Sequence, residues 1–327
     1  MISKILVTGS EGSLMTEVIK VLGTDYEILG VDVKPKKTNE YPFYQFVQAD
    51  LCDAKVVDTI IRTFKPNIII QAAAKIYGVG GFNKHCASIL GDDITLHRNV
   101  LDAAVKHGVD KVVFTSSSMV YERATKHSPV NEEDVYDYGI PLTDYGLSKL
   151  TNERLSEAYW TQYGLKYTIW RPFNIITPYE DASDSLGDSH VFADFIQSLV
   201  VEKKDVLPIL GDGEQVRCFT WIDEVAEVIA HNITNPDTDN QVFNIGRDQP
   251  ISMKDLAVLI RATAMDLNII EKYDFDFDHL SAYQNDVLYR VPDVSKVKEF
   301  LKWQANISVE KSVENILKMK FCREYKK

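Results

Sequence analysis

The sequence predicts an α/β protein with a doubly wound parallel sheet and a smaller C-terminal lobe. Three observations favour this fold. Short apolar runs alternate with helical stretches along much of the chain, which is typical of a parallel sheet covered by helices on both faces. A glycine turn with Gly9 and Gly12 directly follows the first apolar run. After Pro178 the alternating pattern becomes looser.

The apolar runs give the strands in order, and the residues between them give the helices. We expect strands at residues 4–7, 28–32, 68–70, 112–114, 167–170 and 241–245. Helices are expected at residues 14–22, about 90–107 and about 145–163, and Gly108 and Gly164 stand where C-terminal caps belong. A last helix is indicated by Val309, Val313, Ile316, Leu317 and Phe321, which recur at helical spacing.

The looser segment divides the chain into two expected units. Residues 1–177 and 218–248 form the larger domain, and residues 178–217 and 249–327 form the smaller lobe. A length of 327 residues with 45% hydrophobic content is sufficient for two such cores.

Composition and charge exclude several classes of function. The net charge of −12 argues against nonspecific binding to nucleic acid or to acidic membranes. The four cysteines form no Cys-x-x-Cys pair and the seven histidines have no metal-ligand spacing, so neither a disulfide framework nor a metal site is expected. There is no apolar run of membrane-spanning length and no targeting segment, and we therefore expect a cytoplasmic protein.

The glycine turn is a candidate phosphate-binding site. Residues Gly9, Ser10, Glu11 and Gly12 lie between a strand and a helix, where backbone amides can approach a pyrophosphate. This context predicts a Rossmann-type fold. The pattern would place a third glycine at position 15, and this chain has Met15. Because the third glycine mainly permits close packing of helix on strand, Met15 is expected to shift the helix and to leave the phosphate contacts in place.

An acidic residue at the end of the second strand points to the identity of the cofactor. Asp32 follows the glycine turn by about twenty residues, where a carboxylate binds the adenosine ribose, and it favours NAD over NADP. The nearby Lys34, Lys36 and Lys37 keep NADP open as an alternative. Asp50 and Leu51 follow a third strand-like run and are expected to contact the adenine.

The candidate catalytic residues are Ser117, Tyr145 and Lys149. Tyr145 and Lys149 are four residues apart and therefore share one helix face. A nearby cation favours the phenolate, so Lys149 is expected to lower the pKa of Tyr145 and to make it a base. Ser117 ends a strand-like run and can hold the hydroxyl group that Tyr145 deprotonates. Tyr-x-x-x-Lys alone is a common pattern, and its value here comes from the order of the motifs.

The motifs in this order resemble the extended short-chain dehydrogenase/reductase family, in particular its nucleotide-sugar epimerases, dehydratases and reductases. The resemblance covers nearly the whole chain. It is carried by the glycine turn, Tyr145 and Lys149, and by residues 71–74 (QAAA), 116–121 (SSSMVY), 170–174 (WRPFN), 211–217 (GDGEQVR), 219–224 (FTWIDE), 244–246 (NIG) and 290–293 (RVPD).

The resemblance implies a site for NAD and a nucleotide-diphosphate sugar. The larger domain would bind NAD, with Ala72 and Ala73 beside the cofactor, and the smaller lobe would bind the substrate. Asn174, Arg217 and Arg290 would contact the diphosphate, for which the guanidinium fork is well suited. Further implied substrate contacts are Ser118 and His190. Lys149 would also bind the nicotinamide ribose, and relatives form homodimers through their two long helices.

Departures from the subfamily patterns reduce the number of reactions that we expect. Family 4,6-dehydratases carry an Asp-Glu pair where this chain has Ser118 and Met119, so dehydration is not expected. Residues 74–81 and 189–191 resemble the GDP-sugar 3,5-epimerase and 4-reductase group, but that group has a cysteine at the position of Met119. A thioether cannot carry a proton. The remaining expectation is redox chemistry at C4 of a GDP- or UDP-linked sugar, with GDP preferred on the resemblance at residues 78–81 and 189–191. A 4-epimerase is expected because epimerases are frequent in the family, and a C4 dehydrogenase or a 4-keto reductase is the alternative. A noncatalytic dinucleotide sensor is the alternative from another class.

Overall fold

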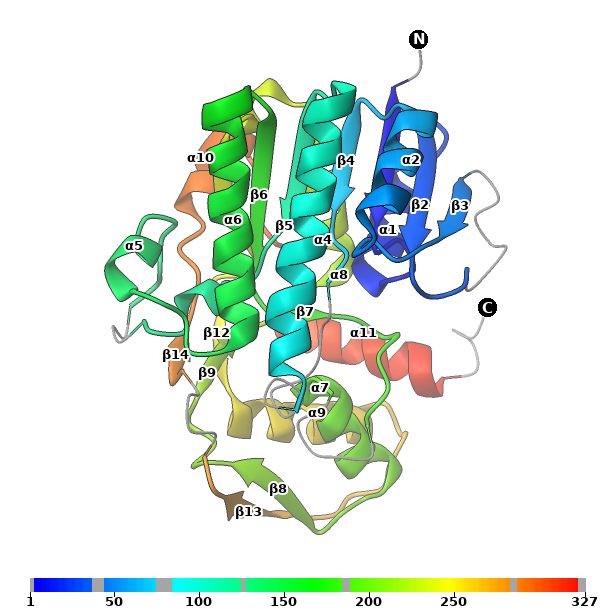
Figure 1. The fold of residues 1–327 in the computed structure, drawn as a ribbon. Helices are drawn as coiled ribbons and strands as arrows, with labels where there is room; N and C mark the ends of the chain where they lie inside the picture. Colours follow the sequence, from blue (N-terminus) through cyan, green and yellow to red (C-terminus); the bar gives the residue numbers. More distant parts are fainter. Residues whose placement is uncertain are drawn as a thin grey trace.

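The computed structural model describes residues 3–36, 44–74, 84–124, 128–183, 189–282 and 287–322. A seven-stranded parallel sheet forms its centre, in the order β11-β6-β5-β4-β1-β2-β3 (Figure 1). The strands are β1 (Lys4–Thr8), β2 (Glu27–Asp32), β3 (Gln45–Gln48), β4 (Ile68–Gln71), β5 (Lys111–Thr115), β6 (Lys166–Pro172) and β11 (Gln241–Ile245). The strand order reverses beside β1, which is typical of a doubly wound sheet, and the predicted fold class is confirmed.

Helices cover both faces of this sheet. α1 (Ser13–Leu22) and α8 (Ile222–His231) pack on one face, and α2 (Ala54–Phe64), α4 (Cys86–His107) and α6 (Asp144–Tyr163) pack on the other. Figure 1 shows α4 and α6 side by side in front of the sheet, with α8 behind it. The arrangement follows from strands that are apolar on both sides: Ile5 and Val7 point into the core under α1, and Leu6 points into the core under α2 and α4.

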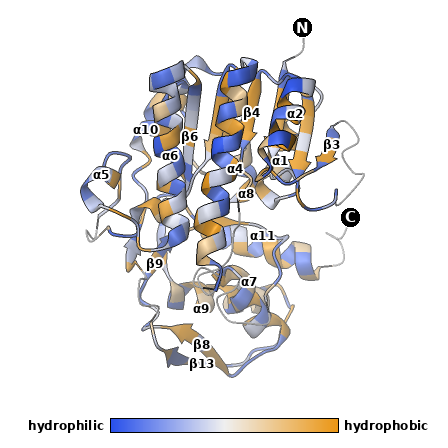
Figure 2. Ribbon diagram, in the orientation of Figure 1, coloured by the Kyte–Doolittle hydropathy of each residue, from blue (hydrophilic) through white to orange (hydrophobic). Residues whose placement is uncertain are grey.

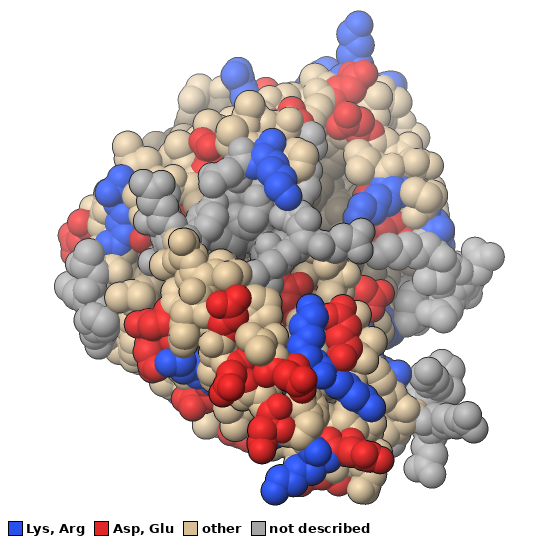
Figure 3. All heavy atoms as spheres, turned by 90° about the horizontal axis from the view of Figure 1, so that it is seen from below, with Lys and Arg blue, Asp and Glu red and all other residues tan. Residues whose placement is uncertain are grey.

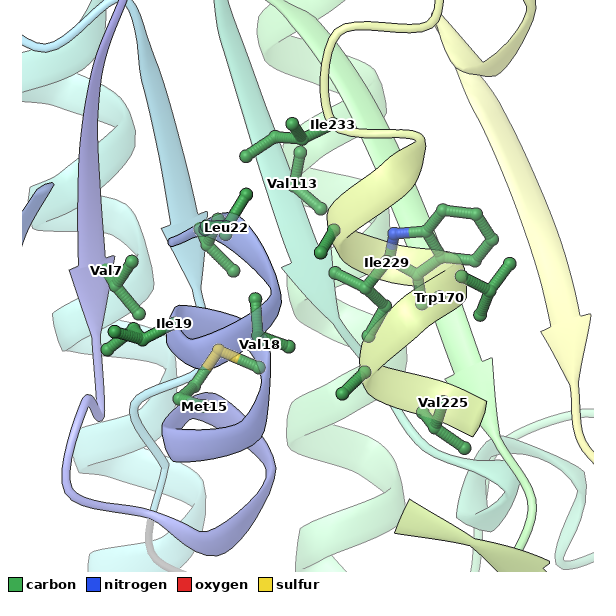
Figure 4. Packing of buried hydrophobic residues seen from close by; sticks show 14 of the residues in the cluster. Val7, Met15, Val18, Ile19, Leu22, Val113, Trp170, Val225, Ile229 and Ile233 are labelled. Carbon is green, nitrogen blue, oxygen red and sulfur yellow. The ribbon is translucent and has the colours of Figure 1, made fainter. Parts of the chain in front are cut away.

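Met15 lies in the core under α1. It is only 2% exposed and packs with Val18, Ile19 and Leu22 against the sheet and α8 (Figure 4). The side chain that replaces the third glycine is therefore part of the core between α1 and the sheet. α10 (Ser295–Leu301) adds Val297 to the same core at the β11 edge of the sheet.

A second group of elements encloses a core of its own, below the sheet in Figure 1. Its helices are α7 (Val191–Ile196), η2 (Gln197–Val201), α9 (Met253–Asp266) and α11 (Val309–Phe321). Its short strands are β8 (Val206–Leu210) with β13 (Asp276–Leu280), and β9 (Val216–Cys218) between β12 (Pro250–Ser252) and β14 (Tyr289–Arg290). β7 (Ile175–Ile176) and β10 (Thr220–Trp221) pair with each other where the chain passes between the two groups.

The helix ends agree with the expected caps. Gly108 and Gly164 end α4 and α6 in the left-handed conformation, with φ of 70° and 73°. The hydropathy colouring shows apolar strands in the sheet and polar residues on the outer sides of the helices that cover it (Figure 2). On the face seen from below, Lys and Arg side chains lie among Asp and Glu side chains (Figure 3). Within the described part of the chain, no helix is long and apolar enough to cross a membrane.

Candidate active site

The glycine turn leaves no room for a side chain at its first glycine. Gly9 has a φ of 68°, and a Cβ there would lie 2.9 Å from the backbone nitrogen of Ala73. The N–H of Gly12 donates to the carbonyl oxygen of Gly9 at 3.0 Å, which closes the turn before α1 begins. Such a turn at the start of a helix brings backbone close to a phosphate group. The predicted glycine turn therefore has the conformation that suits a dinucleotide.

Thr8 holds the turn against the neighbouring strand, and the sequence did not mark it. Its hydroxyl accepts from the backbone N–H groups of Ala72 and Ala73, both at 3.1 Å, and donates to Gln71 Oε1 at 2.8 Å. These three bonds use the full capacity of a hydroxyl group in this geometry. The chain after β4, with Ala72 and Ala73, therefore lies beside Gly9.

Asp32 lies at the end of β2 and faces the same turn. Its carboxylate accepts from the N–H of Glu11 at 3.0 Å and from the N–H of Lys34 at 2.9 Å. The Glu11 side chain in turn accepts from the hydroxyl of Tyr44 at 2.8 Å, while Ser10 is buried below it. Burial, followed by the hydrogen bond to Glu11, raises the pKa of Tyr44. The carboxylate of Asp32 is thus held at the turn, where a ribose would lie.

Asp50 and Leu51 lie in the loop between β3 and α2. Asp50 accepts from the N–H of Cys52 at 2.9 Å, and Leu51 is buried. The Asn99 side chain on α4 donates to the carbonyl oxygen of Leu51 at 2.9 Å and so joins this loop to α4. Of the three lysines that kept NADP open, Lys36 lies with its ammonium 4.0 Å from the Tyr44 ring centre, and Lys37 lies outside the described residues.

Tyr145 and Ser117 are brought together as predicted. Tyr145 is the second residue of α6 and is 7% exposed, and its side chain is hydrogen-bonded to Ser117. Ser117 also caps η1 (Ser118–Tyr121), since its oxygen accepts from the N–H of Met119 at 3.2 Å. Ser118 is buried at the start of the same turn.

Lys149 lies on the same face of α6 as Tyr145. Its Nζ is 5.6 Å from the centre of the Tyr145 ring and donates to the carbonyl oxygen of Thr115 at 3.1 Å. The side chain is 2% exposed, and burial lowers its pKa, while the carboxylates of Asp93 and Glu153 oppose this shift. The shared helix face that the spacing predicted is confirmed.

The expected lowering of the pKa of Tyr145 is corrected by the structure. Burial and the carboxylate of Asp93 raise this pKa, and they outweigh the hydrogen bond with Ser117 and the charge of Arg290, which lower it. The physical reason is desolvation: a phenolate at a buried position loses its hydration, and the ammonium of Lys149 is accompanied by Asp93. Burial and the carboxylate of Asp93 therefore favour the neutral phenol of Tyr145.

Arg290 and Asn174 lie near Tyr145 and Met119. Arg290 Nη2 donates to Asn174 Oδ1 at 3.4 Å, and Nη1 contacts the sulfur of Met119. Met119 packs against Tyr145 in a small apolar cluster. Arg290 therefore lies close enough to Tyr145 for its charge to act on the phenol. Asn174 has a φ of 34°, and its side-chain amide also donates to the carbonyl oxygen of Cys218 at 3.0 Å.

Arg217 is the neighbour of Arg290 in the small sheet. The two residues are register partners in the parallel pair β9–β14, so their side chains leave the sheet on the same side. Arg217 is buried and its Nη1 donates to the carbonyl oxygens of Val216 and Val287 at 2.8 Å and 2.6 Å. Arg217 and Arg290, from two widely separated motifs, therefore lie next to each other in the small sheet.

His190 is the residue directly before α7. Its side chain is 57% exposed, and its Nδ1 is 2.8 Å from Glu180 Oε1. The hydrogen bond with Glu180 is the main cause that raises the pKa of His190, and the charge of Arg290 opposes the shift. His190 is therefore within electrostatic reach of Arg290. Most of the glycine-containing motif at residues 74–81 lies outside the described residues.

Comparison with known proteins identifies the family of this chain. The family model described as the NAD dependent epimerase/dehydratase family matches residues 5–246. The chain belongs to the NAD dependent epimerase/dehydratase family. NAD is accordingly its cofactor, in agreement with the glycine turn and Asp32.

Two curated relatives and one solved structure show the range within this family. A UDP-glucuronate 4-epimerase of Thermodesulfobacterium geofontis is 28% identical over 85% of this chain and 79% of its own. A UDP-N-acetyl-alpha-D-glucosaminuronate decarboxylase of Bacillus cytotoxicus is 30% identical over 71% of this chain and 74% of its own. The UDP-glucose 4-epimerase of Thermotoga maritima, solved with UDP-glucose, is 26% identical with a TM-score of 0.82, covering 98% of this chain and 99% of that one.

Several buried polar residues of this family member were not anticipated from its sequence. Glu153 on α6 binds Arg171 on β6 through two hydrogen bonds, of 2.6 Å and 3.0 Å, behind the catalytic pair. Glu122 binds Thr143 at the start of α6, and Asp93 lies on α4 beside Lys149. Arg171 lies in the motif at residues 170–174, whereas Glu122, Glu153 and Asp93 lie outside the motifs that carry the family resemblance. Only the packing of α6 on α4 and β6 brings these residues together. In the described part of the chain, no group of three or more His, Cys, Asp or Glu residues could hold a metal ion.

Proposed function

We propose that the protein is an NAD-dependent nucleotide-diphosphate-sugar 4-epimerase. The observation that carries this proposal is the hydrogen-bonded pair of Ser117 and Tyr145, with Lys149 on the same helix face and Arg290 beyond Met119. A hydroxyl group bound between Ser117 and Tyr145 would lie at the edge of the sheet where β1 and β5 end, and this edge also carries the turn that suits NAD. The curated epimerase relative and the structure solved with UDP-glucose support a nucleotide sugar as the substrate.

The residues of this chain supply the proton chemistry of the reaction. Tyr145 takes the proton of the C4 hydroxyl and Ser117 holds the oxygen, while the C4–H bond breaks and its electron pair leaves as hydride. NAD, when bound, accepts this hydride and later returns it. The ammonium of Lys149 would favour the phenolate against the burial and the carboxylate of Asp93, which raise the pKa of Tyr145, and Lys149 would also bind the nicotinamide ribose. When the 4-keto sugar turns over, Tyr145 returns the proton to the oxygen as hydride reaches the opposite face of C4, so that atoms and electrons balance.

The remaining side chains would bind the substrate. Arg217, Arg290 and Asn174 are assigned to the diphosphate, since a pair of adjacent guanidinium groups suits its oxygens. Ser118 and His190 are assigned to the sugar. Met119 packs against Tyr145 and offers no proton, which supports redox chemistry at C4 alone. UDP is favoured by the named relatives, and a GDP-linked sugar is kept as the alternative on the resemblance at residues 189–191.

Two alternative reactions would use the same residues. If the 4-keto sugar leaves, the enzyme is a C4 dehydrogenase, and if a ketone arrives, it is a 4-keto reductase. The test adds UDP-glucose, UDP-galactose, UDP-glucuronate, UDP-N-acetylglucosamine and GDP-mannose singly to the NAD-loaded protein. Products are identified by NMR while reduced-nicotinamide absorbance is followed. A new C4 epimer without net reduction supports the epimerase, and accumulation of reduced cofactor with a keto sugar overturns it in favour of the dehydrogenase.

A noncatalytic dinucleotide sensor is the candidate from another class. The presence of both Tyr145 and Lys149 argues against it. Replacement of Tyr145 by Phe should abolish turnover and leave NAD binding, measured by isothermal titration calorimetry, nearly unchanged. Turnover that persists in Tyr145→Phe contradicts the catalytic role of Tyr145.

The proposal also covers the roles of the two units, the oligomeric state and the location of the protein. Residues 1–177 with 218–248 are assigned to NAD binding, and residues 178–217 with 249–327 to substrate binding. A homodimer is proposed through the outer sides of α4 and α6, where small side chains such as Ala87, Gly91 and Thr95 are exposed along α4. Light scattering coupled to gel filtration tests it, and a monomeric mass contradicts it. The free cysteines among the described residues agree with the proposed cytoplasmic location.

A further inference from the structure

A buried carboxylate on α4 faces the two residues assigned to proton chemistry on α6. Asp93 is 1% exposed, and its Oδ2 accepts from the hydroxyl of Ser148 at 3.4 Å. Its backbone oxygen accepts from the side chain of Asn152 at 3.2 Å. Ser148 lies between Tyr145 and Lys149 along the chain, and residues three and four apart share a helix face. The packing of α4 against α6 therefore aims Asp93 at the face that carries both residues.

The charged groups near this face of α6 differ in the partners that they already have. Glu153 is a second carboxylate near Lys149, and it is engaged with Arg171 and with Ser116. His97, one turn after Asp93 on α4, is fully buried, and burial lowers its pKa to about 3, so it is neutral and adds no charge beside Lys149. The charges of Arg290 and Glu122 also act on Tyr145, where Arg290 lowers its pKa and Glu122 raises it. Asp93 is thus the carboxylate on α4 that acts on Tyr145 and Lys149 together.

A buried ammonium is costly unless a counter-charge accompanies it. We propose that Asp93 is a positioning residue that keeps the buried Lys149 in its charged form and sets the pH range in which Tyr145 and Lys149 work. It acts through these two residues and does not itself touch the reacting atoms. This inference rests on the catalytic roles proposed above for Tyr145 and Lys149.

The carboxylate of Asp93 shifts the pKa values of Tyr145 and Lys149 in the same direction. The carboxylate of Asp93 raises the pKa of Tyr145, because it disfavours the phenolate, and it raises the pKa of Lys149, because it favours the ammonium. The ascending limb of the pH–rate profile needs the phenolate, and the descending limb needs the ammonium. Removal of the charge of Asp93 therefore moves both limbs to lower pH.

The experiment measures kcat/KM against pH for the NAD-loaded wild type and the Asp93→Asn variant. Asn keeps the shape of the side chain and an acceptor for Ser148, and it removes only the charge. Both limbs should shift to lower pH by on the order of one unit. The matched control is Asp102→Asn, which makes the same change on α4 at a side chain that is 55% exposed and should leave the profile in place. If Asp93→Asn does not fold, Asp93→Ala tests the same shift.

A second readout separates this inference from the proposed function. The ionisation of Tyr145 is followed without turnover as the tyrosinate absorbance of the protein minus that of its Tyr145→Phe variant, in the wild-type and Asp93→Asn backgrounds. A lower midpoint in the Asp93→Asn background supports the inference. A lower rate with an unmoved profile and midpoint would show that Asp93 is merely structural, and this overturns the inference. Turnover that survives Tyr145→Phe would instead overturn the proposed function.

Discussion

The carboxylate of Glu122 accepts two hydrogen bonds from Thr143, one from the backbone N–H at 2.7 Å and one from the hydroxyl at 2.8 Å. The same hydroxyl accepts from the N–H of Gly146 at 3.0 Å and so caps α6. At Gly146 a Cβ would lie 2.7 Å from the carbonyl oxygen of Met119, so α6 begins in close contact with η1. Through these contacts the chain after Ser117 determines where Tyr145 lies.

Replacement of Glu122 by Gln should destabilise the protein and lower kcat. The amide has one acceptor oxygen, so one of the two bonds from Thr143 is lost at a buried position, at a cost of about 1–3 kcal/mol in the free energy of unfolding. Urea denaturation measures this cost. Thr143→Ser keeps the hydroxyl group and the cap, and it is the control that should retain most of the stability and activity.

The difference in stability between wild type and Glu122→Gln should depend on pH. Burial raises the pKa of Glu122 above its ordinary 4.5, so the folded protein binds this proton more tightly than the unfolded chain. The stability of the wild type relative to Glu122→Gln is therefore greatest below pH 4.5 and falls as the pH rises through the pKa of the folded state. A difference that increases with pH in the urea data would contradict this account.

Replacement of Gly9 by Ala should weaken NAD binding. The residue has a φ of 68°, which costs an alanine about 1–3 kcal/mol, and its Cβ would lie 2.9 Å from the backbone of Ala73. Relief of this contact moves the turn away from the chain after β4. Calorimetric titration with NAD measures the loss. Gly91→Ala is the control, because a Cβ on the outer side of α4 has no atom within 4 Å, and unchanged affinity in Gly9→Ala would contradict the assignment of the turn.

Restoration of the third glycine of the motif by Met15→Gly should destabilise the protein. The substitution removes a buried side chain from the core under α1 and places a glycine in a helix, for a combined cost of about 3–5 kcal/mol. Met15→Leu keeps most of the volume and should cost less than about 1.5 kcal/mol. Thermal melts of the two variants measure the difference. Equal melting temperatures would show that Met15 is not needed for packing. Retention of NAD by the Met15→Gly variant on desalting, compared with the wild type, tests whether the start of α1 affects binding of the cofactor.

Local signals were sufficient for the sheet and much of the cofactor turn. Apolar runs of three to five residues with glycine or polar residues at their ends mark strands buried on both faces, and β11 was predicted with its observed bounds. Helix α6 could be predicted because Gly164 ends it and Tyr145 and Lys149 share a face. The short strands β9, β12 and β14 have two or three residues, which is too few to give a periodic pattern.

The charges around Tyr145 could not be predicted from the sequence. Asp93 is far from Tyr145 along the chain, and only the packing of α4 on α6 brings its carboxylate to the phenol. The spacing of Tyr145 and Lys149 indicates that a cation is near, but it contains no information on burial or on the counter-charge. The expected direction of the pKa of Tyr145 was therefore wrong, although the two residues were identified from the sequence.

Replacement of Glu180 by Gln should lower the pKa of His190. The carboxylate of Glu180 accepts from Nδ1 of His190 at 2.8 Å and is the main cause that raises this pKa above its ordinary 6.5. The stabilisation from the pair is present below pH 6.5 and is lost as the pH rises through the pKa of the folded state. It is small, since the His190 side chain is 57% exposed. Proton NMR of the histidine ring against pH measures the shift, with Asp181→Asn, at a side chain 92% exposed, as the control. An unchanged midpoint in Glu180→Gln would show that the pair does not persist in solution.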